Sequence, residues 1–493
     1  MRLYQSTRST ACVSDTEAVL LGIAPDGGLY LDPHLAEKPF DWKGCLEKDS
    51  LGIAAQLLSA FFPSYPQMEE LVKKAYTGKF ETPDLTPLVK VGGSYVLELF
   101  RGPTSAFKDV ALSMLPQLIT AAKALEGKQE KTLILTATSG DTGKAALAGF
   151  ADVPGTEIIV FYPHGGVSPV QQAQMATQAG ANVHVCAVRG NFDDCQSAVK
   201  AAFAAFGEEG SHYAKALDAA HTRLSSANSI NIGRLAPQLS YYFIAYKKLL
   251  EEGRIALGDP VDFTVPTGNF GDILAGYFAK LLGLPVGRLI LASNANRVLT
   301  DFMENGCYDR RRDFMKTNSP SMDILISSNL ERLLFLAAEG DSAQVAKWMK
   351  ELKEQGWYQL PEEVFARIRE SFAAGCCDEQ ETLAEIRRVY EKDGYLCDTH
   401  TAVAMKVARE LQRAEVPMVV LSTASPFKFP AAVLTAIGGK LEGDEFEQME
   451  ELSRESGLPI PAGLAGLKER PVLHREVIDR EAIADYVLDI VRR

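Results

Sequence analysis

The middle of the chain alternates short apolar runs with longer amphipathic runs. Short runs rich in Val, Ile and Leu predict buried strands, and runs with apolar residues on one helical face predict helices. Strands are expected at residues 131–137, 157–162, 182–188, 261–265, 287–292 and 417–422, and helices at 143–151, 168–179, 192–206 and 272–283. Strands followed by a loop and a helix are typical of a mostly parallel sheet covered on both faces. The pattern therefore predicts an α/β protein.

Two long segments have a different pattern. Residues 1–82 contain apolar helical runs and the turn Pro25-Asp26-Gly27-Gly28, and they end near Thr82-Pro83. We interpret them as an N-terminal unit, followed by a main α/β region over residues 83–493. Residues 300–395 are charged and carry few strand signals. They are expected to form a mainly helical insertion that packs outside the sheet.

Composition narrows the classes of function. The 493 residues are 46% hydrophobic and carry a formal net charge of −13, and the one dense basic run, residues 310–312, is flanked by aspartates, which argues against nucleic-acid binding. No run approaches the roughly 20 apolar residues that span a bilayer, and the N-terminus lacks the apolar core of a signal peptide. The eight cysteines have no CxxC spacing, and the seven histidines form no HxH or HxxxH pair. We therefore expect a cytoplasmic protein with reduced thiols and no metal site.

Four loops place reactive or hydrogen-bonding residues at strand ends or helix starts, where an open α/β sheet binds its ligands. The first, residues 102–109 (GPTSAFKD), contains Lys108 beside Ala106-Phe107, just before a predicted helix. A lysine that forms a Schiff base must lose its proton, and burial among apolar side chains favours the neutral form. By itself, the pattern also fits an ordinary surface lysine beside a core phenylalanine.

The other three loops are rich in glycines, hydroxyls and amides. Residues 138–143 (TSGDTG) and 267–272 (TGNFGD) each follow a strand and open a helix, so their backbone N–H groups and hydroxyls could bind an anion. Residues 226–234 end in Arg234, whose guanidinium could bind a phosphate or a carboxylate. Each loop also has an ordinary interpretation: an N-cap at Asp141, a two-glycine turn that matches neither the P-loop nor GxGxxG, or a helix entry with a surface arginine.

Taken together and in this order, the loops resemble those of the pyridoxal 5'-phosphate (PLP) enzymes related to the tryptophan synthase β-subunit. Within that group the sequence is similar to the threonine synthase family. The similarity is carried by residues 4–7 (YQST), 22–30 (GIAPDGGLY), the Lys108 segment, 138–143, 228–231 (NSIN) and 421–426 (LSTASP). It runs from residue 1 to about residue 430. The long insertion resembles the bacterial and fungal type of the family.

The resemblance implies a tryptophan synthase β-like enzyme of fold type II and a role for each matched residue. Lys108 would carry PLP as a Schiff base and then act as general base and acid. Further cofactor contacts would come from Asp141, Gly268, Asn269, Phe270, Gly271, Asp272 and Thr423, with Thr423 at the pyridine nitrogen and Asp141 where many relatives carry Asn. The substrate carboxylate would bind Ser139, Gly140 and Thr142, and the substrate phosphate would bind Asn228, Ser229 and Arg234. Lys144 is either a further charge at this site or an exposed helix lysine.

The implied reaction is the conversion of O-phospho-L-homoserine and water to L-threonine and phosphate. We expect a monomer or weak homo-oligomer that acts on this small molecule and has no nucleic-acid or membrane partner. Two rival hypotheses remain open. One is a PLP-dependent dehydratase or phospho-lyase that releases a 2-keto acid, and the other is a non-catalytic scaffold that has kept the fold.

Overall fold

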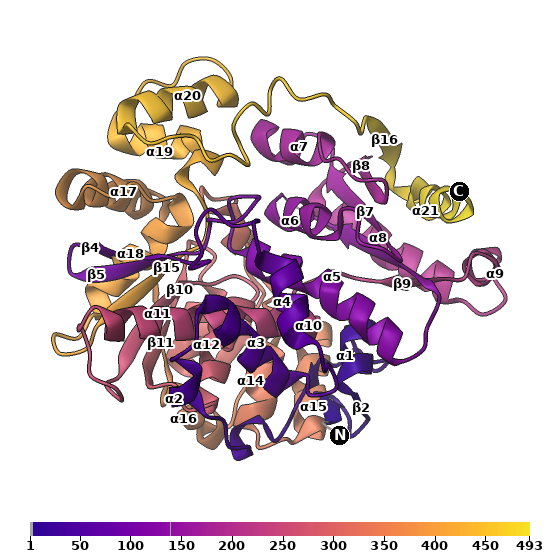
Figure 1. Cartoon of the computed structure of the whole chain (residues 1–493), viewed down its shortest axis with the longest axis horizontal. Helices are drawn as coiled ribbons and strands as arrows, with labels where there is room; N and C mark the ends of the chain where they lie inside the picture. Colours follow the sequence, from indigo (N-terminus) through magenta and orange to yellow (C-terminus); the bar gives the residue numbers. More distant parts are fainter. Residues whose placement is uncertain (1–2, 139) are drawn as a thin grey trace.

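Two largely parallel sheets organise the protein in the computed structural model, which describes residues 3–138 and 140–493 (Figure 1). Within these residues, the larger sheet has the strand order β14-β11-β10-β15-β5-β4 and the smaller sheet has the order β16-β8-β7-β6-β9. All neighbouring strands run parallel except β4, which pairs with β5 in the antiparallel direction. The expected α/β fold with mostly parallel sheets is confirmed.

The elements have the following bounds. The larger sheet comprises β4 (Leu88–Val91), β5 (Ser94–Glu98), β10 (Val261–Pro266), β11 (Val286–Ser293), β14 (Phe372–Cys376) and β15 (Met418–Ser422). The smaller sheet comprises β6 (Lys131–Ala137), β7 (Thr156–Pro163), β8 (Val183–Arg189), β9 (Thr222–Ser225) and β16 (Glu476–Asp479). The short strands are β1 (Leu3–Ser6), β2 (Cys12–Ser14), β3 (Tyr30–Leu31), β12 (Cys307–Asp309) and β13 (Trp357–Gln359).

The helices lie between or after these strands, singly or in groups. Those before the smaller sheet and around it are α1 (Asp15–Leu21), α2 (Trp42–Cys45), α3 (Ser50–Phe61), α4 (Met68–Tyr76), α5 (Lys108–Leu125), α6 (Asp141–Phe150), α7 (Pro169–Ala176), α8 (Phe192–Gly207), α9 (His212–Ala219) and α10 (Ile232–Leu235). The later ones are α11 (Leu239–Glu251), α12 (Gly271–Leu281), α13 (Val298–Asn305), α14 (Leu330–Ala337), α15 (Ser342–Glu354), α16 (Glu362–Arg369), α17 (Glu379–Asp393), α18 (Thr399–Leu411), α19 (Pro430–Ile437), α20 (Glu445–Ser456) and α21 (Ile483–Arg492).

The central strands of both sheets are buried on both faces: successive side chains of a strand point to opposite sides of the sheet, and in these strands both are buried. In β6, Ile134 packs into the main core with α5 and α6, whereas Leu135 packs with α8 and α21 on the other face. In β15, Val419 belongs to the main core and Val420 to a second core that includes residues of α17, α18 and α19. Strands buried in this way read as continuous apolar runs, which is why the sequence pattern located them.

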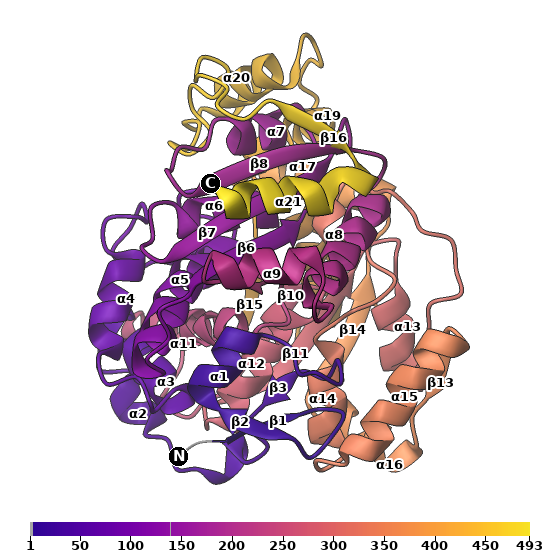
Figure 2. The ribbon, with the colours of Figure 1, turned by 90° about the vertical axis from the view of Figure 1, so that its right-hand side faces the viewer.

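The segment 300–395 differs from its prediction in one respect. Most of it is helical, and Figure 2 shows α13, α15 and α16 with β13 at the lower right, away from the smaller sheet. However, β14 pairs in parallel with β11 and forms an edge of the larger sheet, so this strand does not pack outside it. Its sequence, FAAGC, has no β-branched residue and only one aromatic residue, and it therefore gives a weak strand signal.

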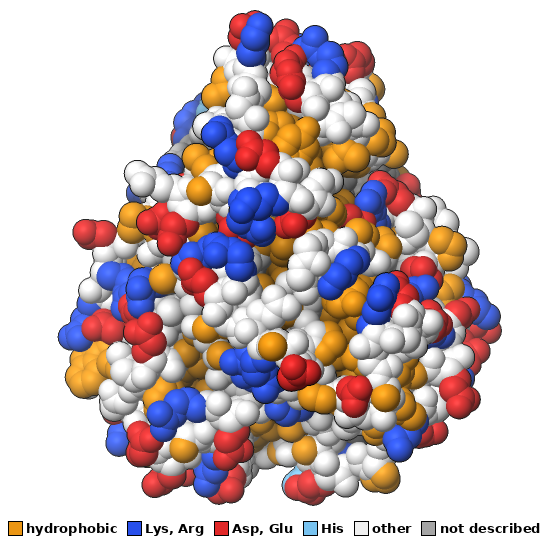
Figure 3. Space-filling view, turned by 90° about the vertical axis from the view of Figure 1, so that its left-hand side faces the viewer, with side chains coloured by type: hydrophobic (Ala, Val, Ile, Leu, Met, Phe, Trp, Pro, Cys, Tyr) orange, Lys and Arg blue, Asp and Glu red, His pale blue; other side chains and the backbone are white. Residues whose placement is uncertain are grey.

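The surface carries charges of both signs. On the face shown in Figure 3, basic and acidic side chains are interspersed. Within the described part of the chain, no helix is long and apolar enough to cross a membrane.

Candidate functional site

The predicted site loops follow strands that are neighbours in the two sheets. In the larger sheet β10, β15 and β5 lie side by side, and they lead into residues 267–271, Thr423 and the Lys108 loop. In the smaller sheet β6 and β9 are neighbours and lead into residues 138–143 and 226–234. Parallel strands end at the same edge of a sheet, so the loops of each sheet come together. Helix α5, which begins at Lys108, packs against α6 and joins the two groups (Figure 1).

The Lys108 loop is fixed to the end of β15 by backbone contacts. The Phe107 N–H donates to the carbonyl of Thr423 at 2.8 Å, and the Ser425 N–H donates to the carbonyl of Ser105 at 3.1 Å. Ser105 has a φ of 59°, a left-handed conformation that non-glycine residues rarely adopt. Such a residue commonly marks a constrained functional turn. Together these contacts set the position from which the Lys108 side chain starts.

The surroundings of Lys108 favour its neutral amine. Burial lowers the pKa of Lys108 from 10.5 to about 8, with the Asp141 carboxylate acting in the opposite direction and the charges of Arg234 and Lys428 adding to the decrease. Only the neutral amine can attack an aldehyde, so a lower pKa makes this lysine reactive near neutral pH. The same interactions show that Asp141, Arg234 and Lys428 lie within electrostatic range of the Lys108 amine.

The pH dependence of PLP uptake should report this pKa. The rate at which PLP-free protein incorporates PLP should rise with pH up to about 8 and then level off, because the neutral fraction of the amine saturates above its pKa. The check is the rate of growth of the bound-PLP absorption band at a fixed PLP concentration across this range. A rate that keeps rising beyond about pH 9 would indicate an ordinary lysine, whose pKa is 10.5.

Gly140 and Gly143 are joined to Thr138 by hydrogen bonds to its side chain. The Thr138 hydroxyl accepts hydrogen bonds from the Gly140 N–H at 3.0 Å and the Gly143 N–H at 2.9 Å. Gly140 has a φ of 145°, and a Cβ there would lie 2.3 Å from the amide of Gln171, so only glycine fits. Thr142 lies in the first turn of α6, where N–H groups face outward from the helix start. Ser139, a predicted carboxylate contact, lies outside the described residues.

Asp141 forms a buried ion pair that the sequence did not reveal. Its Oδ1 lies 2.7 Å from Nζ of Lys428 and accepts a hydrogen bond from Gln171 at 3.0 Å. Burial alone would raise the pKa of Asp141, but the adjacent charges of Lys428 and Lys108 hold it well below its ordinary value. Lys428 also donates to the carbonyl of Thr104 at 3.1 Å, and the Thr104 hydroxyl donates to Asp109 at 2.6 Å. The Lys108 loop and the loop at residues 138–143 are therefore joined through Lys428.

The loop between β10 and α12 has the form of an anion cradle. The backbone N–H groups of residues 268–272 donate no hydrogen bond to any residue that the structure describes. Phe270 is left-handed, with a φ of 62°, and the N-terminus of α12 follows directly. A run of unpaired N–H groups at a helix start binds a phosphate well. Ser321 approaches so closely that a Cβ on Gly268 would lie 2.8 Å from its carbonyl oxygen.

The carboxyl of Asp272 points away from this cradle. It accepts hydrogen bonds from Tyr241 and, at 3.2 Å, from Tyr242 of α11, and burial raises its pKa to about 7 while these tyrosines act to lower it. Asp272 could therefore hydrogen-bond to an anion only through its backbone N–H group. The side chain instead fixes α12 against α11.

Arg234 is a buried guanidinium that forms no ion pair with any residue that the structure describes. Its side chain donates to the carbonyl of Ala227 at 2.6 Å, and no described carboxylate shifts its pKa. Only 5% of the residue is exposed, and burial lowers its pKa to about 10. Buried charges are usually paired, so this one indicates an anion site. Asn228 is exposed and Ser229 half-buried at the start of the same segment.

The Thr423 side chain is buried and available for a hydrogen bond, whereas that of Lys144 already has a partner. Thr423 is buried at the end of β15, and within the described residues its hydroxyl has no hydrogen bond to another side chain or to the backbone. The Thr423 hydroxyl is therefore available to bind a ligand.

Lys144 is buried rather than exposed, and it donates to Gln178 beyond α7. Burial lowers the pKa of Lys144 to about 8.

The segment 300–395 contributes residues that sequence reasoning missed. Asn329 binds the carbonyls of Asn269 at 3.1 Å and Ser229 at 3.2 Å, and so joins two of the predicted loops. Arg332 is fully buried, with hydrogen bonds to Asn329, to the carbonyl of Tyr30 at 3.0 Å and to that of Ile230 at 2.6 Å. The segment thus holds the anion cradle, the Arg234 segment and the N-terminal residues together.

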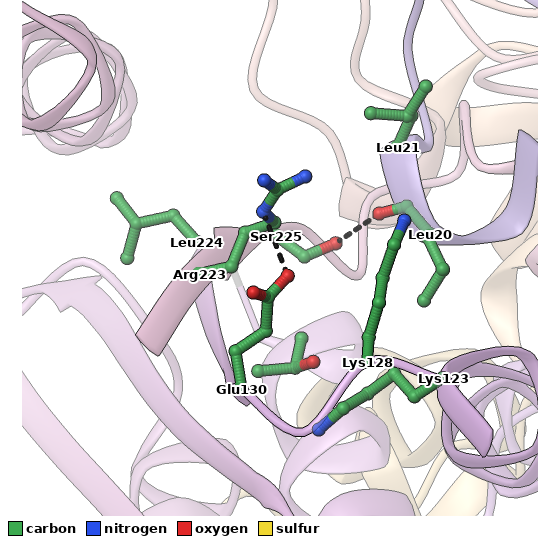
Figure 4. A pocket seen from close by; sticks show the side chains of 9 residues that line it. Leu20, Leu21, Lys123, Lys128, Glu130, Arg223, Leu224 and Ser225 are labelled. Atoms are coloured by element: carbon green, nitrogen blue, oxygen red, sulfur yellow. Dashed lines mark hydrogen bonds and ion pairs between the residues drawn. The ribbon is translucent and has the colours of Figure 1, made fainter. Parts of the chain in front are cut away.

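The described residues do not hold a cluster that would bind a metal ion: no group of three or more His, Cys, Asp or Glu side chains is suitably placed. A cavity of about 600 Å³ lies elsewhere, between the start of α3, the end of α4 and α11. A much smaller one, of about 20 Å³, lies beside β9 and the end of α5 (Figure 4).

Three features define a class of protein: a buried lysine of lowered pKa at a helix start, an anion cradle after a neighbouring strand, and a threonine hydroxyl that hydrogen-bonds to none of the described residues. Residues 79–423 match the family of pyridoxal-phosphate dependent enzymes, and the chain belongs to it. PLP is accordingly its cofactor, and the fold is that of the fold type II members.

The more specific matches are to threonine synthases. Residues 401–487 match the C-terminal family of threonine synthase. The threonine synthase of Pseudomonas aeruginosa is 40% identical over 87% of this chain and 89% of that protein. The crystal structure of PLP-bound threonine synthase from Brucella melitensis has a TM-score of 0.86 and 40% identity, covering 99% of this chain and 98% of that one. The yeast enzyme has a TM-score of 0.84 and 32% identity over 100% and 98%. The chain belongs to the threonine synthase family.

A longer group of relatives shares the same region. Threonine synthase-like 1 of Homo sapiens is 37% identical over 94% of this chain, but the match covers 62% of that protein. The chain thus spans about 62% of the length of these relatives.

Proposed function

We propose that this protein converts O-phospho-L-homoserine and water to L-threonine and phosphate, with PLP bound at Lys108. The observation that carries the proposal is Arg234, a buried guanidinium that has no acidic partner among the described residues and lies within electrostatic range of Lys108. The cradle at residues 268–272 fits the phosphate of the cofactor. With the loop at residues 138–143 assigned to the substrate carboxylate, Arg234 would bind a further anion, which the phosphate of the substrate supplies.

Each residue has a defined task in this proposal. PLP supplies an electron sink that stabilises negative charge at the substrate Cα. The Lys108 amine removes the Cα proton, then a Cβ proton, and returns protons as the reaction proceeds. Arg234, with Asn228 and Ser229, holds the γ-phosphate and stabilises the charge that develops as it leaves. Water then adds at Cβ to complete threonine.

The remaining predicted contacts orient the substrate and the cofactor. The loop formed by Gly140 and Thr142, with Ser139, receives the substrate carboxylate. The backbone of Gly268, Asn269, Phe270, Gly271 and Asp272 holds the cofactor phosphate, while Asp141 and Thr423 contact its ring substituents and its nitrogen. A threonine hydroxyl can accept or donate a proton in a hydrogen bond, so it does not enforce a protonated nitrogen as a carboxylate would.

The direct experiment is a product analysis with O-phospho-L-homoserine as the only substrate. Threonine and phosphate should form in equal amounts. A dehydratase or phospho-lyase would release phosphate with 2-oxobutyrate and ammonia instead, which would refute the proposal. Failure to bind PLP, together with no turnover, would favour the non-catalytic scaffold.

Thr423 provides a test of the role given to the cofactor nitrogen. Replacing Thr423 with Asp should raise the share of side products more than it weakens PLP binding, because a carboxylate favours the protonated ring and a stronger electron sink. Thr423→Asn is the matched control, since it has the same size as the aspartate without the charge. The checks are the ratio of 2-oxobutyrate to threonine and the Kd of PLP. An unchanged ratio with weaker PLP binding would assign Thr423 a purely structural contact.

We further propose a cytoplasmic enzyme that is a monomer or weak homo-oligomer. All eight cysteines are free thiols, which supports a reducing compartment. Light scattering over a range of protein concentrations tests the oligomeric state.

A further inference from the structure

Lys428 is a lysine in an unusual place. It ends the short helical turn Pro426–Lys428 after β15, only 1% of it is exposed, and it lies among Phe427, Phe429 and Pro430 in the sequence. Lysines are almost never fully buried unless they are paired. Lys428 follows a strand of the larger sheet, and its side chain reaches Asp141 at the start of α6, the helix that follows β6 of the smaller sheet.

The two oxygens of the Asp141 carboxylate have different surroundings. Oδ1 receives both Lys428, at 2.7 Å, and Gln171, at 3.0 Å. Oδ2 accepts no hydrogen bond from any described residue, and it is not among the fully buried atoms that lack a partner. Within the described residues, one oxygen is therefore fixed and the other is open to a further donor, and the carboxylate as a whole lies within electrostatic range of the Lys108 amine.

The charges around Lys108 explain why Asp141 is paired with Lys428. Arg234 and Lys428 are cationic groups within electrostatic range of Lys108, and Asp141 is the acidic group that acts on Lys108. An isolated buried carboxylate would take up a proton, because burial disfavours the charged form. Lys428 keeps Asp141 ionised, so the open oxygen accepts a hydrogen bond and cannot donate one.

We propose that Lys428 is a positioning residue which, through Asp141, presents a charged acceptor oxygen to the ring hydroxyl of the cofactor next to Lys108. An asparagine at position 141 would offer an amide donor instead and would need no buried cation. The pair Asp141–Lys428 is thus a unit: the lysine matters because residue 141 is an acid. This inference rests on the proposed cofactor site and names a group that neither the loops nor their spacing indicated.

A double-mutant cycle tests the dependence of one residue on the other. The four proteins are wild type, Lys428→Met, Asp141→Asn and the double variant, each saturated with PLP. In the wild-type background, Lys428→Met should move the absorption maximum of bound PLP and lower kcat about tenfold, within the range of coupling between contacting residues. In the Asp141→Asn background the same change should leave the absorption maximum in place and alter kcat less than about twofold.

Two controls separate positioning from simple destabilisation. Lys123→Met removes another buried lysine, which donates to the carbonyl of Gly155 at 3.0 Å and lines the small cavity in Figure 4. It should lower Tm without moving the absorption maximum. Lys428→Arg keeps the positive charge and should retain the wild-type absorption maximum even where its kcat is lower, so the test stands even when Lys428→Met does not fold.

The absorption measurements need bound PLP but no particular reaction, so they stay informative even when the product analysis refutes the proposed function. Equal effects of Lys428→Met in the wild-type and Asp141→Asn backgrounds would overturn the inference, because a structural lysine acts in both. An unchanged absorption maximum in folded Lys428→Met would overturn it as well.

Discussion

Replacing Lys108 with alanine should leave the protein folded and abolish threonine formation. A general acid–base group contributes roughly 10²–10⁴-fold to a rate, and Lys108 has more than one such task in addition to binding the cofactor covalently. The fold should survive because the amine lies near two other cations, Arg234 and Lys428, whose charges already disfavour its protonated form. Replacing Lys108 removes this repulsion together with the attraction between Lys108 and Asp141, and the two changes act on stability in opposite directions.

Three measurements check this result. Turnover of O-phospho-L-homoserine should be undetectable, Tm should stay close to that of wild type, and the absorption band of bound PLP should be lost. Reduction of the wild-type protein with borohydride, followed by peptide mass spectrometry, should place the label on Lys108. Lys123→Ala serves as the control, because this lysine sits at the other end of the same helix. Activity of Lys108→Ala within tenfold of wild type would contradict the assignment.

The sequence predicted the strands that are both apolar and central. Residues 131–137 are β6 as predicted, and 417–422 differ from β15 by one residue, because strands buried on both faces are continuous apolar runs. β5 and β14 were missed for a physical reason. β5, with the sequence SYVLE, mixes polar and apolar residues, and β14 owes its place to pairing with β11, which no local pattern encodes.

The site was predictable to the extent that its residues lie in local motifs. The loops around Lys108, Gly140 and Gly268 stand where a strand gives way to a helix, and that position is readable from the pattern alone. Lys428 and Asn329 were not found, because their importance lies in contacts with residues far away in the sequence. One signal for Lys428 was available: a lysine inside the apolar run FKFP is expected to be buried, and a buried lysine needs a partner.

Replacing Arg234 with leucine should damage the use of O-phospho-L-homoserine while the protein stays folded and binds PLP. Leucine fills much of the buried space and removes a charge that no described carboxylate balances, so the loss of stability should be small. The loss of a charge-assisted hydrogen bond costs about 1.5–3 kcal/mol, which corresponds to roughly ten- to a hundred-fold in kcat/KM. Arg234→Lys should recover only part of this, because an ammonium cannot bind two phosphate oxygens as a planar fork does.

The division of the loss between kcat and KM carries the mechanistic information. Charge accumulates on the phosphate as its bond to Cγ breaks, so an arginine that stabilises the departing group acts more strongly in the transition state, and part of the loss should fall on kcat. Inhibition by free phosphate should weaken in parallel.

The control is Arg223→Leu, which removes an exposed arginine paired with Glu130 at 3.2 Å (Figure 4). This change should alter kcat/KM little, since such surface pairs are worth about 0–1 kcal/mol. If Arg234→Leu changes neither kcat/KM nor phosphate inhibition beyond about twofold, Arg234 is structural. The substrate phosphate must then bind elsewhere. Lys144, which is buried on α6 just after the loop at residues 138–143, is the next residue to replace.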